Sequence, residues 1–228
     1  MKHKLTATLD HVITFLLLIV AGITPLLFFN QTTEFYEMPK LIFLVISVLV
    51  LTGLWIFSWI LKGKVMITRT PLDIPLLVLL VVVVASAYFS ESRFSAIYGN
   101  FPRVHGSAVA WVTYILLYFV TVSHLRNLTQ IKTFMYTLYG SGLVVALISL
   151  LSYFGLFLPL DFAKAVNFTP TGSSFSTVAF LLLLLPFPVL SLINPNRYLP
   201  TGPAIALASI FGVTIALLGG VSTYVAML

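Results

Sequence analysis

The stretch PKLIFLVISVLVLTGLWIFSWIL (residues 39–61) carries one charged residue, Lys40, near its start and is otherwise almost wholly apolar. A helix of about 20 such residues crosses the hydrocarbon core of a bilayer. The apolar run is continuous and does not alternate with polar positions, which favours a helix over a strand of a membrane barrel. This stretch is therefore predicted to be a membrane-spanning helix.

Similar apolar runs recur along the chain, with short polar breaks between them. They predict seven spans, near residues 10–29, 39–61, 72–90, 107–125, 133–156, 174–193 and 203–228. The composition agrees, because 60% of the 228 residues are hydrophobic and only 8% are charged, whereas soluble domains carry about 25% charged residues. The predicted fold class is all-α, a polytopic transmembrane helix bundle that forms one domain over residues 1–228.

The net charge of +6 comes from 12 basic residues that stand at the ends of these runs. This dispersed placement indicates membrane topology rather than nucleic-acid binding. On the side of the N-terminus fall Lys2, Lys4, Lys62, Lys64, Arg69, Arg126, Lys132 and Arg197. On the other side fall Lys40, Arg93, Arg103 and Lys164. By the positive-inside rule, the N-terminus is predicted to be cytoplasmic.

Three local patterns predict helix ends, breaks and contacts. In Thr70-Pro71-Leu72-Asp73, Thr70 can cap a helix, Pro71 suits its first position, and Asp73 can reach back to the cap. Pro186 and Pro188 are expected to kink the sixth span, because each removes a backbone donor. Small residues at every fourth position of the seventh span predict a close-packed helix face: Ala204, Ala208, Gly212, Ala216 and Gly220.

The break at residues 91–106 is the first candidate binding site. It combines Arg93 and Arg103 with His105 and aromatic residues such as Tyr98. Guanidinium groups bind phosphate bidentately, and aromatic rings stack on sugars or lie at the level of lipid headgroups. The loop therefore suits a lipid-linked phosphate or pyrophosphate. The alternative is an interfacial anchor in which both arginines bind lipid headgroups.

A second candidate site is the break that opens the sixth span. Thr171, Ser173 and Ser174 supply hydroxyl groups beside the unpaired amides of a helix N-terminus, which together can bind an anion. Plain N-capping is the alternative. The sequence contains no cysteine and no His, Asp and Glu spacing typical of a metal site, so it predicts no metal.

Four segments, taken in order, resemble the N-terminal half of O-antigen ligase-like membrane proteins. They are FYEMPK (35–40), RTPLDIP (69–75), YGNFPRVHG (98–106) and TPTGSS (169–174). The resemblance implies a glycosyltransferase of the bacterial inner membrane that needs no metal or other cofactor. It implies as partners a polyprenyl-pyrophosphate-linked glycan donor, membrane lipid and a glycan acceptor. The external arginines would hold the pyrophosphate.

Two departures from that family pattern affect the expectation. Family members often carry an arginine just before the sixth-span motif, where this chain reads Thr169-Pro170-Thr171-Gly172-Ser173-Ser174. The family's large loop with its histidine base is absent up to Leu228, so the catalytic residue stays unassigned. We expect the chain to be the carrier-binding part of a longer protein, inactive alone. A transporter or flippase half and a non-catalytic membrane scaffold are the alternative functions.

Overall fold

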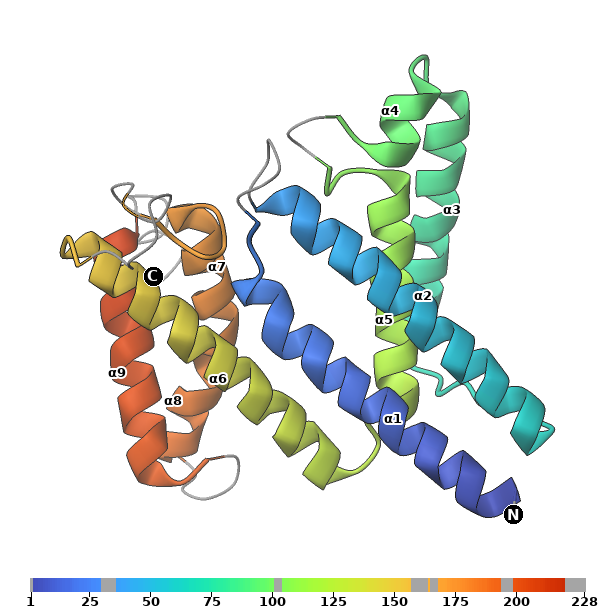
Figure 1. Cartoon of the computed structure of the whole chain (residues 1–228), viewed down its shortest axis with the longest axis horizontal. Helices are drawn as coiled ribbons and strands as arrows, with labels where there is room; N and C mark the ends of the chain where they lie inside the picture. The colour runs from blue at the N-terminus through green and yellow to red at the C-terminus, as the bar shows by residue number, and fades with distance from the viewer. Residues whose placement is uncertain are drawn as a thin grey trace. The chain divides into compact units, whose positions relative to one another are not determined.

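The computed structural model describes residues 2–29, 36–100, 104–156, 164, 168–193 and 199–219. Their regular elements are helical, which confirms the all-α prediction. The elements are α1 (Lys2–Ile23), η1 (Thr24–Leu26), α2 (Glu37–Lys62), α3 (Asp73–Phe89), α4 (Arg93–Tyr98), α5 (Ala108–His124), α6 (Leu128–Tyr153), α7 (Ser174–Leu184), α8 (Pro186–Ile193) and α9 (Thr201–Leu218) (Figure 1).

Within the described residues, five helical segments are long and apolar enough to cross a bilayer, as expected of a multi-pass membrane protein. They are Lys4–Leu26, α2, α6, Ser174–Ile193 and α9. Helices α3 and α5 are apolar but have 17 residues each. Large apolar side chains also lie on the outside of these helices, among them Leu49 at 64% exposure and Val81 at 67%. Such a surface suits contact with lipid.

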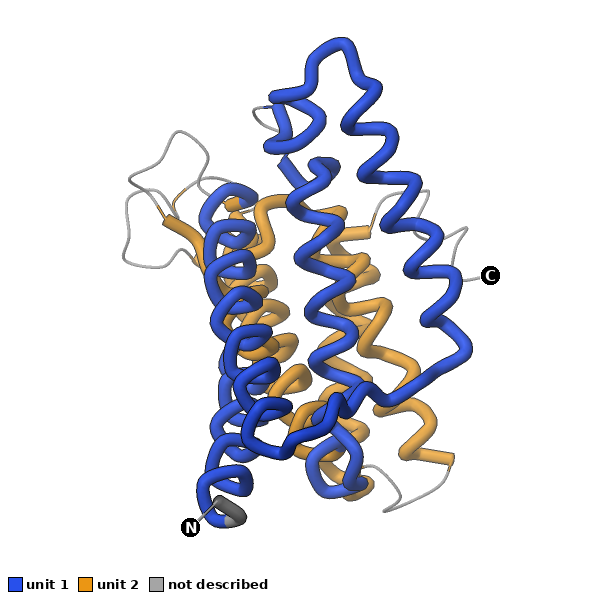
Figure 2. The backbone as a smooth tube through the Cα atoms, turned by 90° about the vertical axis from the view of Figure 1, so that its right-hand side faces the viewer, with its two compact units in different colours: residues 1–20, 37–131 blue, residues 21–36, 132–228 orange. Residues whose placement is uncertain are grey.

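The helices form two compact units, each with its own core (Figure 2). Unit 1 comprises residues 1–20 and 37–131, and unit 2 comprises residues 21–36 and 132–228. The prediction of a single domain over residues 1–228 stays a prediction.

The main core of unit 1 lies where α1, α2 and α5 meet. Ile13 and Leu17 of α1 pack there with Leu51 and Trp55 of α2 and with Val120 of α5. Helix α3 contributes little to the unit's interior, because Ala87 is its one buried residue. It runs beside α5 and is followed by the short helix α4 (Figure 1).

The core of unit 2 joins α6, α7, α8 and α9. Its buried residues are Tyr139, Ala146, Val178, Leu181, Leu184, Leu199, Ala204, Leu207, Phe211 and Ile215. The close approach of these helices depends on Gly142 of α6. A Cβ built on Gly142 would lie 2.7 Å from Leu184 Cδ1 and 3.1 Å from Phe211 Cζ.

Several local predictions are confirmed and others need correction. Asp73 Oδ2 accepts from the Thr70 amide at 2.9 Å, as expected, but α3 begins only at Asp73, so Pro71 precedes the helix. The sixth span is interrupted at Leu185, between α7 and α8, where the prolines stand. Helix α1 runs over residues 2–23 rather than 10–29, because a polar first turn can be helical and Pro25 follows its end.

The predicted small-residue face of α9 is only partly in contact. Ala204 is buried, but the other buried positions of α9 are Leu207, Phe211, Thr214 and Ile215. A Cβ on Gly212 would meet no atom within 4 Å. Larger side chains therefore form the packing face of α9 within unit 2. Gly220 lies outside the described residues.

Candidate functional site

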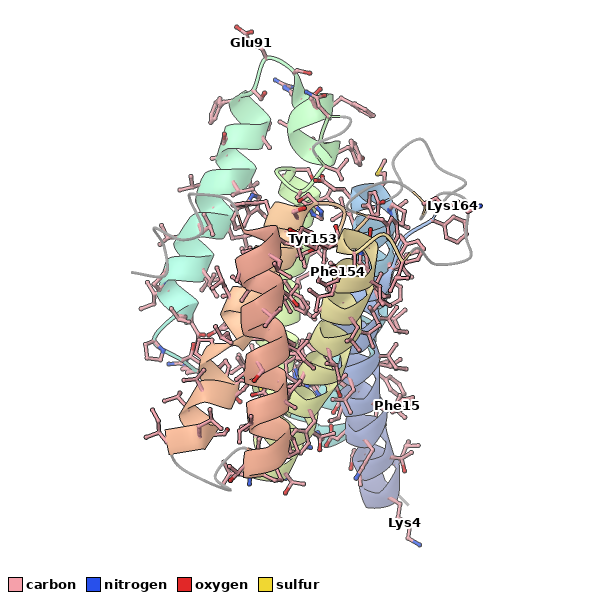
Figure 3. The ribbon with its side chains drawn as sticks, turned by 90° about the vertical axis from the view of Figure 1, so that its left-hand side faces the viewer. Lys4, Phe15, Glu91, Tyr153, Phe154 and Lys164 are labelled. Atoms are coloured by element: carbon pink, nitrogen blue, oxygen red, sulfur yellow. The ribbon has the colours of Figure 1, made fainter. Side chains whose placement is uncertain are left out.

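The first candidate site occupies the end of unit 1 where α3 passes into α4 and α5. Figure 3 shows Glu91 at the tip of the α3–α4 turn, pointing away from the helices. The next helix, α4, begins at Arg93. The Arg93 guanidinium carbon lies 5.2 Å from the ring centroid of Tyr88 at the end of α3. This cation–π contact leaves Arg93 on an exposed surface.

Two exposed aromatic rings lie on the same short helix as this arginine. Phe94 and Tyr98 are neighbours one turn apart on α4, with ring centroids 5.0 Å apart. Phe94 is 74% exposed and Tyr98 is 58% exposed. A short helix that presents one cation and two exposed rings can lie at the level of lipid headgroups or against a sugar.

His105 lies in the segment that leads from this surface into α5. Its Nδ1 is 2.6 Å from the Tyr114 hydroxyl, and either tautomer of the ring satisfies the contact. Val104 is buried beside Leu41 and Ala110, and Ser107 Oγ accepts from the Ala110 amide at 3.2 Å to cap α5. His105 is thus held by a well-packed turn. Arg103 lies outside the described residues, so its predicted role stays a prediction.

The second candidate site is the N-terminus of α7 in unit 2. Ser173 is its N-cap, and Ser173 Oγ accepts from the Ser176 amide at 3.0 Å. Thr171 Oγ1 lies 2.5 Å from Thr177 Oγ1 in the first turn of α7. The hydroxyls of Thr171 and Ser173 are therefore engaged within the cap. Ser174, the first residue of α7, is half-buried.

The loop before α7 packs on the segment before α2. The Phe168 ring contacts Phe28 edge-on at a centroid distance of 5.6 Å and lies 6.2 Å from the Tyr36 ring. A Cβ on Gly172 would come within 2.8 Å of Tyr36 Cβ. Burial raises the pKa of the Tyr36 phenol above its ordinary value. The cap of α7 is therefore braced by aromatic side chains.

The predicted site residues thus belong to both units. Arg93, Tyr98 and His105 are in unit 1, whereas Thr171, Ser173 and Ser174 are in unit 2.

The sequence reasoning missed a polar cluster in unit 1. Asp10 of α1, Lys62 at the end of α2 and His124 at the end of α5 lie together. The basic residues were interpreted as topology signals, and the histidine as lacking ligand-like spacing. One signal was present in the sequence, because Asp10 is a carboxylate at the edge of a predicted span, and such groups are rarely placed there without a partner.

No family model, curated protein or solved structure matches the chain. The functional interpretation therefore depends on the chain's own residues and on the ordered motifs described above.

Proposed function

We propose that this chain forms the donor-binding part of a membrane glycan transferase of the O-antigen ligase type. Such an enzyme moves a glycan from an undecaprenyl-pyrophosphate carrier to an acceptor on the outer face of the bacterial inner membrane. The four ordered motifs support the proposal, and so does the surface formed by α4 and its flanking turns. The catalytic base is not assigned.

The observation that carries the proposal is the setting of Arg93. Its guanidinium stands over the Tyr88 ring, and the same short helix carries the exposed rings of Phe94 and Tyr98. A guanidinium that stacks on a ring face can still offer its edge N–H groups to an anion. A pyrophosphate accepts such donors bidentately, and neighbouring rings can contact the first sugar or the headgroup region.

In this proposal the arginines act on the leaving group. Negative charge grows on the departing undecaprenyl pyrophosphate as the bond from the glycan to phosphate breaks. Arg93 and Arg103 would stabilise that charge. His105, bonded to Tyr114, would orient a donor oxygen rather than remove a proton.

Binding of the carrier by the purified chain tests the proposal. The wild type, Arg93→Gln and Arg69→Gln are reconstituted in nanodiscs and titrated with undecaprenyl pyrophosphate. Arg69 is a matched control, since it is also exposed and precedes α3, whereas Arg93 follows that helix. Loss of a charge-assisted contact is expected to weaken binding about tenfold in Arg93→Gln.

The control should bind the carrier as the wild type does. Equal affinities of the two variants would remove Arg93 from the donor site. A wild-type chain that binds undecaprenyl pyrophosphate no better than undecaprenol would contradict the proposed function.

A further inference from the structure

A polar cavity of about 220 Å³ lies in unit 1, at the end where α1 begins and where α2 and α5 end. This is the end that carries Lys4, whereas Glu91 lies at the opposite end of the unit (Figure 3). Its lining comes from α1, α2, the segment after α2, α5, the connection from α5 to α6, and the start of α6. The polar lining residues used below are Asp10, Trp59, Lys62, Ser123 and Arg126.

The charges of this cavity do not cancel. Lys62 Nζ lies 2.8 Å from Asp10 Oδ2 and 2.9 Å from Oδ1, so these two residues neutralise each other. Arg126 remains as an additional cation. Its Nε donates to the Ser123 carbonyl at 2.8 Å, and among the described residues no acceptor contacts its two terminal nitrogens. The cavity therefore has excess positive charge and unused guanidinium donors.

Two further polar groups in the cavity wall are buried without a partner. They are the Ser123 hydroxyl and the Trp59 indole nitrogen. Ser123 is only 6% exposed, and an indole N–H can only donate. A buried donor without an acceptor costs about 1–3 kcal/mol. An occupant that supplies acceptor oxygens would remove this cost.

The position and size of the cavity restrict that occupant. Trp55 and Trp59 form an aromatic wall with ring centroids 4.5 Å apart, near the end of α2. Tryptophan at the ends of spanning helices is typical of the headgroup level, and basic pockets between such helices bind acidic headgroups. The volume is smaller than the roughly 300–1,000 Å³ of sites for drug-sized ligands, which suits a single headgroup.

We propose that this cavity binds the phosphate of an anionic phospholipid headgroup, with Arg126, the Trp59 indole and the Ser123 hydroxyl as its donors. Phosphate oxygens are acceptors only, which matches the donors left unpaired in the wall. The acyl chains would remain in the bilayer beside unit 1. This site is independent of the proposed glycan-donor site at the α4 end.

Tryptophan fluorescence offers a local readout of binding. The chain has 3 tryptophans, so a Trp111→Phe background leaves Trp55 and Trp59, both of which line the cavity. The delipidated chain in neutral detergent is titrated with dioctanoyl phosphatidylglycerol, dioctanoyl phosphatidylcholine and sn-glycerol 3-phosphate. Phosphatidylglycerol should shift the emission and raise the melting temperature at concentrations where the other two probes have little effect.

Two variants in this background test the proposed donors, and a third serves as their control. Arg126→Gln should weaken phosphatidylglycerol binding about tenfold, because it removes a charge-assisted contact. Arg69→Gln makes the same chemical change outside the cavity and should leave the affinity unchanged. Ser123→Ala should weaken binding about threefold while the lipid-free chain keeps or gains stability, because it deletes an unpaired buried hydroxyl.

Each remaining outcome counts against the assignment. Equal affinities of Arg126→Gln and Arg69→Gln, or no response to phosphatidylglycerol, would overturn the phosphate site. Equal responses to phosphatidylglycerol and phosphatidylcholine would overturn its preference for anionic lipid. If sn-glycerol 3-phosphate binds as tightly as the lipid, the claim that the bound phosphate belongs to a phospholipid is wrong. The site would then be assigned to a soluble phosphate ester.

Discussion

Lys62 and Asp10, 52 positions apart in the sequence, form a bidentate ion pair with Nζ–O distances of 2.8 and 2.9 Å. The pair ties the last residue of α2 to the first half of α1, next to the core formed by Ile13, Leu51 and Trp55. It connects two consecutive α-helices through residues that lie far apart in the sequence, because most of α1 and most of α2 stand between them. The Lys62 side chain is 22% exposed and the Asp10 side chain is 42% exposed, so water screens part of the attraction between them.

A double-mutant cycle should measure this link. We expect Asp10→Asn and Lys62→Gln to show a coupling of about 0.5–1 kcal/mol in the free energy of unfolding, since the pair is partly exposed. The measurement is reversible denaturation in mixed micelles. The cycle of Glu91→Gln with Lys64→Gln, two exposed residues at different ends of α3, is the control and should show no coupling. A coupling of zero at Asp10 and Lys62 would mean that the pair does not join the helices.

The packing of α6 in unit 2 gives a second prediction. Gly142→Val should lower the free energy of unfolding by about 1–3 kcal/mol more than Gly140→Val, because its side chain would enter space held by Leu184 and Phe211. Both glycines are in α6, so the helix-propensity cost of valine is the same. A Cβ on Gly140 meets nothing within 4 Å. Equal melting temperatures for the two variants would contradict the close approach of α6, α7 and α9.

A third prediction concerns the loop before α7. Gly172 has φ +102°, and its added Cβ would come within 2.8 Å of Tyr36 Cβ, an atom close to the backbone that cannot easily move away. Gly155 has φ +77° with open space around it. Both alanine variants therefore share the left-handed backbone cost of about 1–2 kcal/mol, and Gly172→Ala should lose about 1–3 kcal/mol more. Thermal unfolding of the pair measures the difference.

The same pair of variants tests how much the contact between Tyr36 and the cap of α7 contributes to stability. If Gly172→Ala and Gly155→Ala have equal melting temperatures, the contact between Tyr36 and the α7 cap does not contribute to the free energy of unfolding. The phenol offers an independent measurement, since relief of burial in Gly172→Ala should bring the pKa of Tyr36 back toward 10.0.

Membrane topology provides the fourth prediction. The chain has no cysteine, so single cysteines report sidedness without background labelling. A membrane-impermeant maleimide added to intact cells should label Glu91→Cys but should label Lys64→Cys only after permeabilisation, because the basic residues favour a cytoplasmic N-terminus. Reversed labelling would place Arg93 in the cytoplasm and contradict the proposed function.

The sequence predicts the helical spans well because their signal is local and strong. Apolar runs of about 20 residues need no tertiary information, and the Thr70–Asp73 cap and the prolines at 186 and 188 act within a few residues of themselves. The six-residue helix α4 was missed because it is too short and too polar for periodicity to be recognised. The first span was predicted to begin near residue 10, whereas α1 begins at Lys2, because the first turns of α1 are polar and the apolar run starts after them.

The candidate sites were only partly predictable. The residues of the α4 surface stand close together in the sequence, so their composition marks the loop. The cavity at Asp10, Lys62 and Arg126 unites three distant segments, none of which has a distinctive pattern. The packing face of α9 depends on which neighbours reach it, and there Leu207 and Phe211 displace the small residues as contacts.

The interruption of the sixth span at Leu185 also affects how that segment can respond to strain. In a continuous helix, the amides of residues 186 and 188 would bond the carbonyls of Leu182 and Leu184, but both positions are proline and carry no amide hydrogen. Two backbone hydrogen bonds are therefore missing halfway along the segment. Bending there breaks fewer bonds than elsewhere, so α8 can tilt against α7 when bilayer thickness changes, while each half keeps its own helical turns.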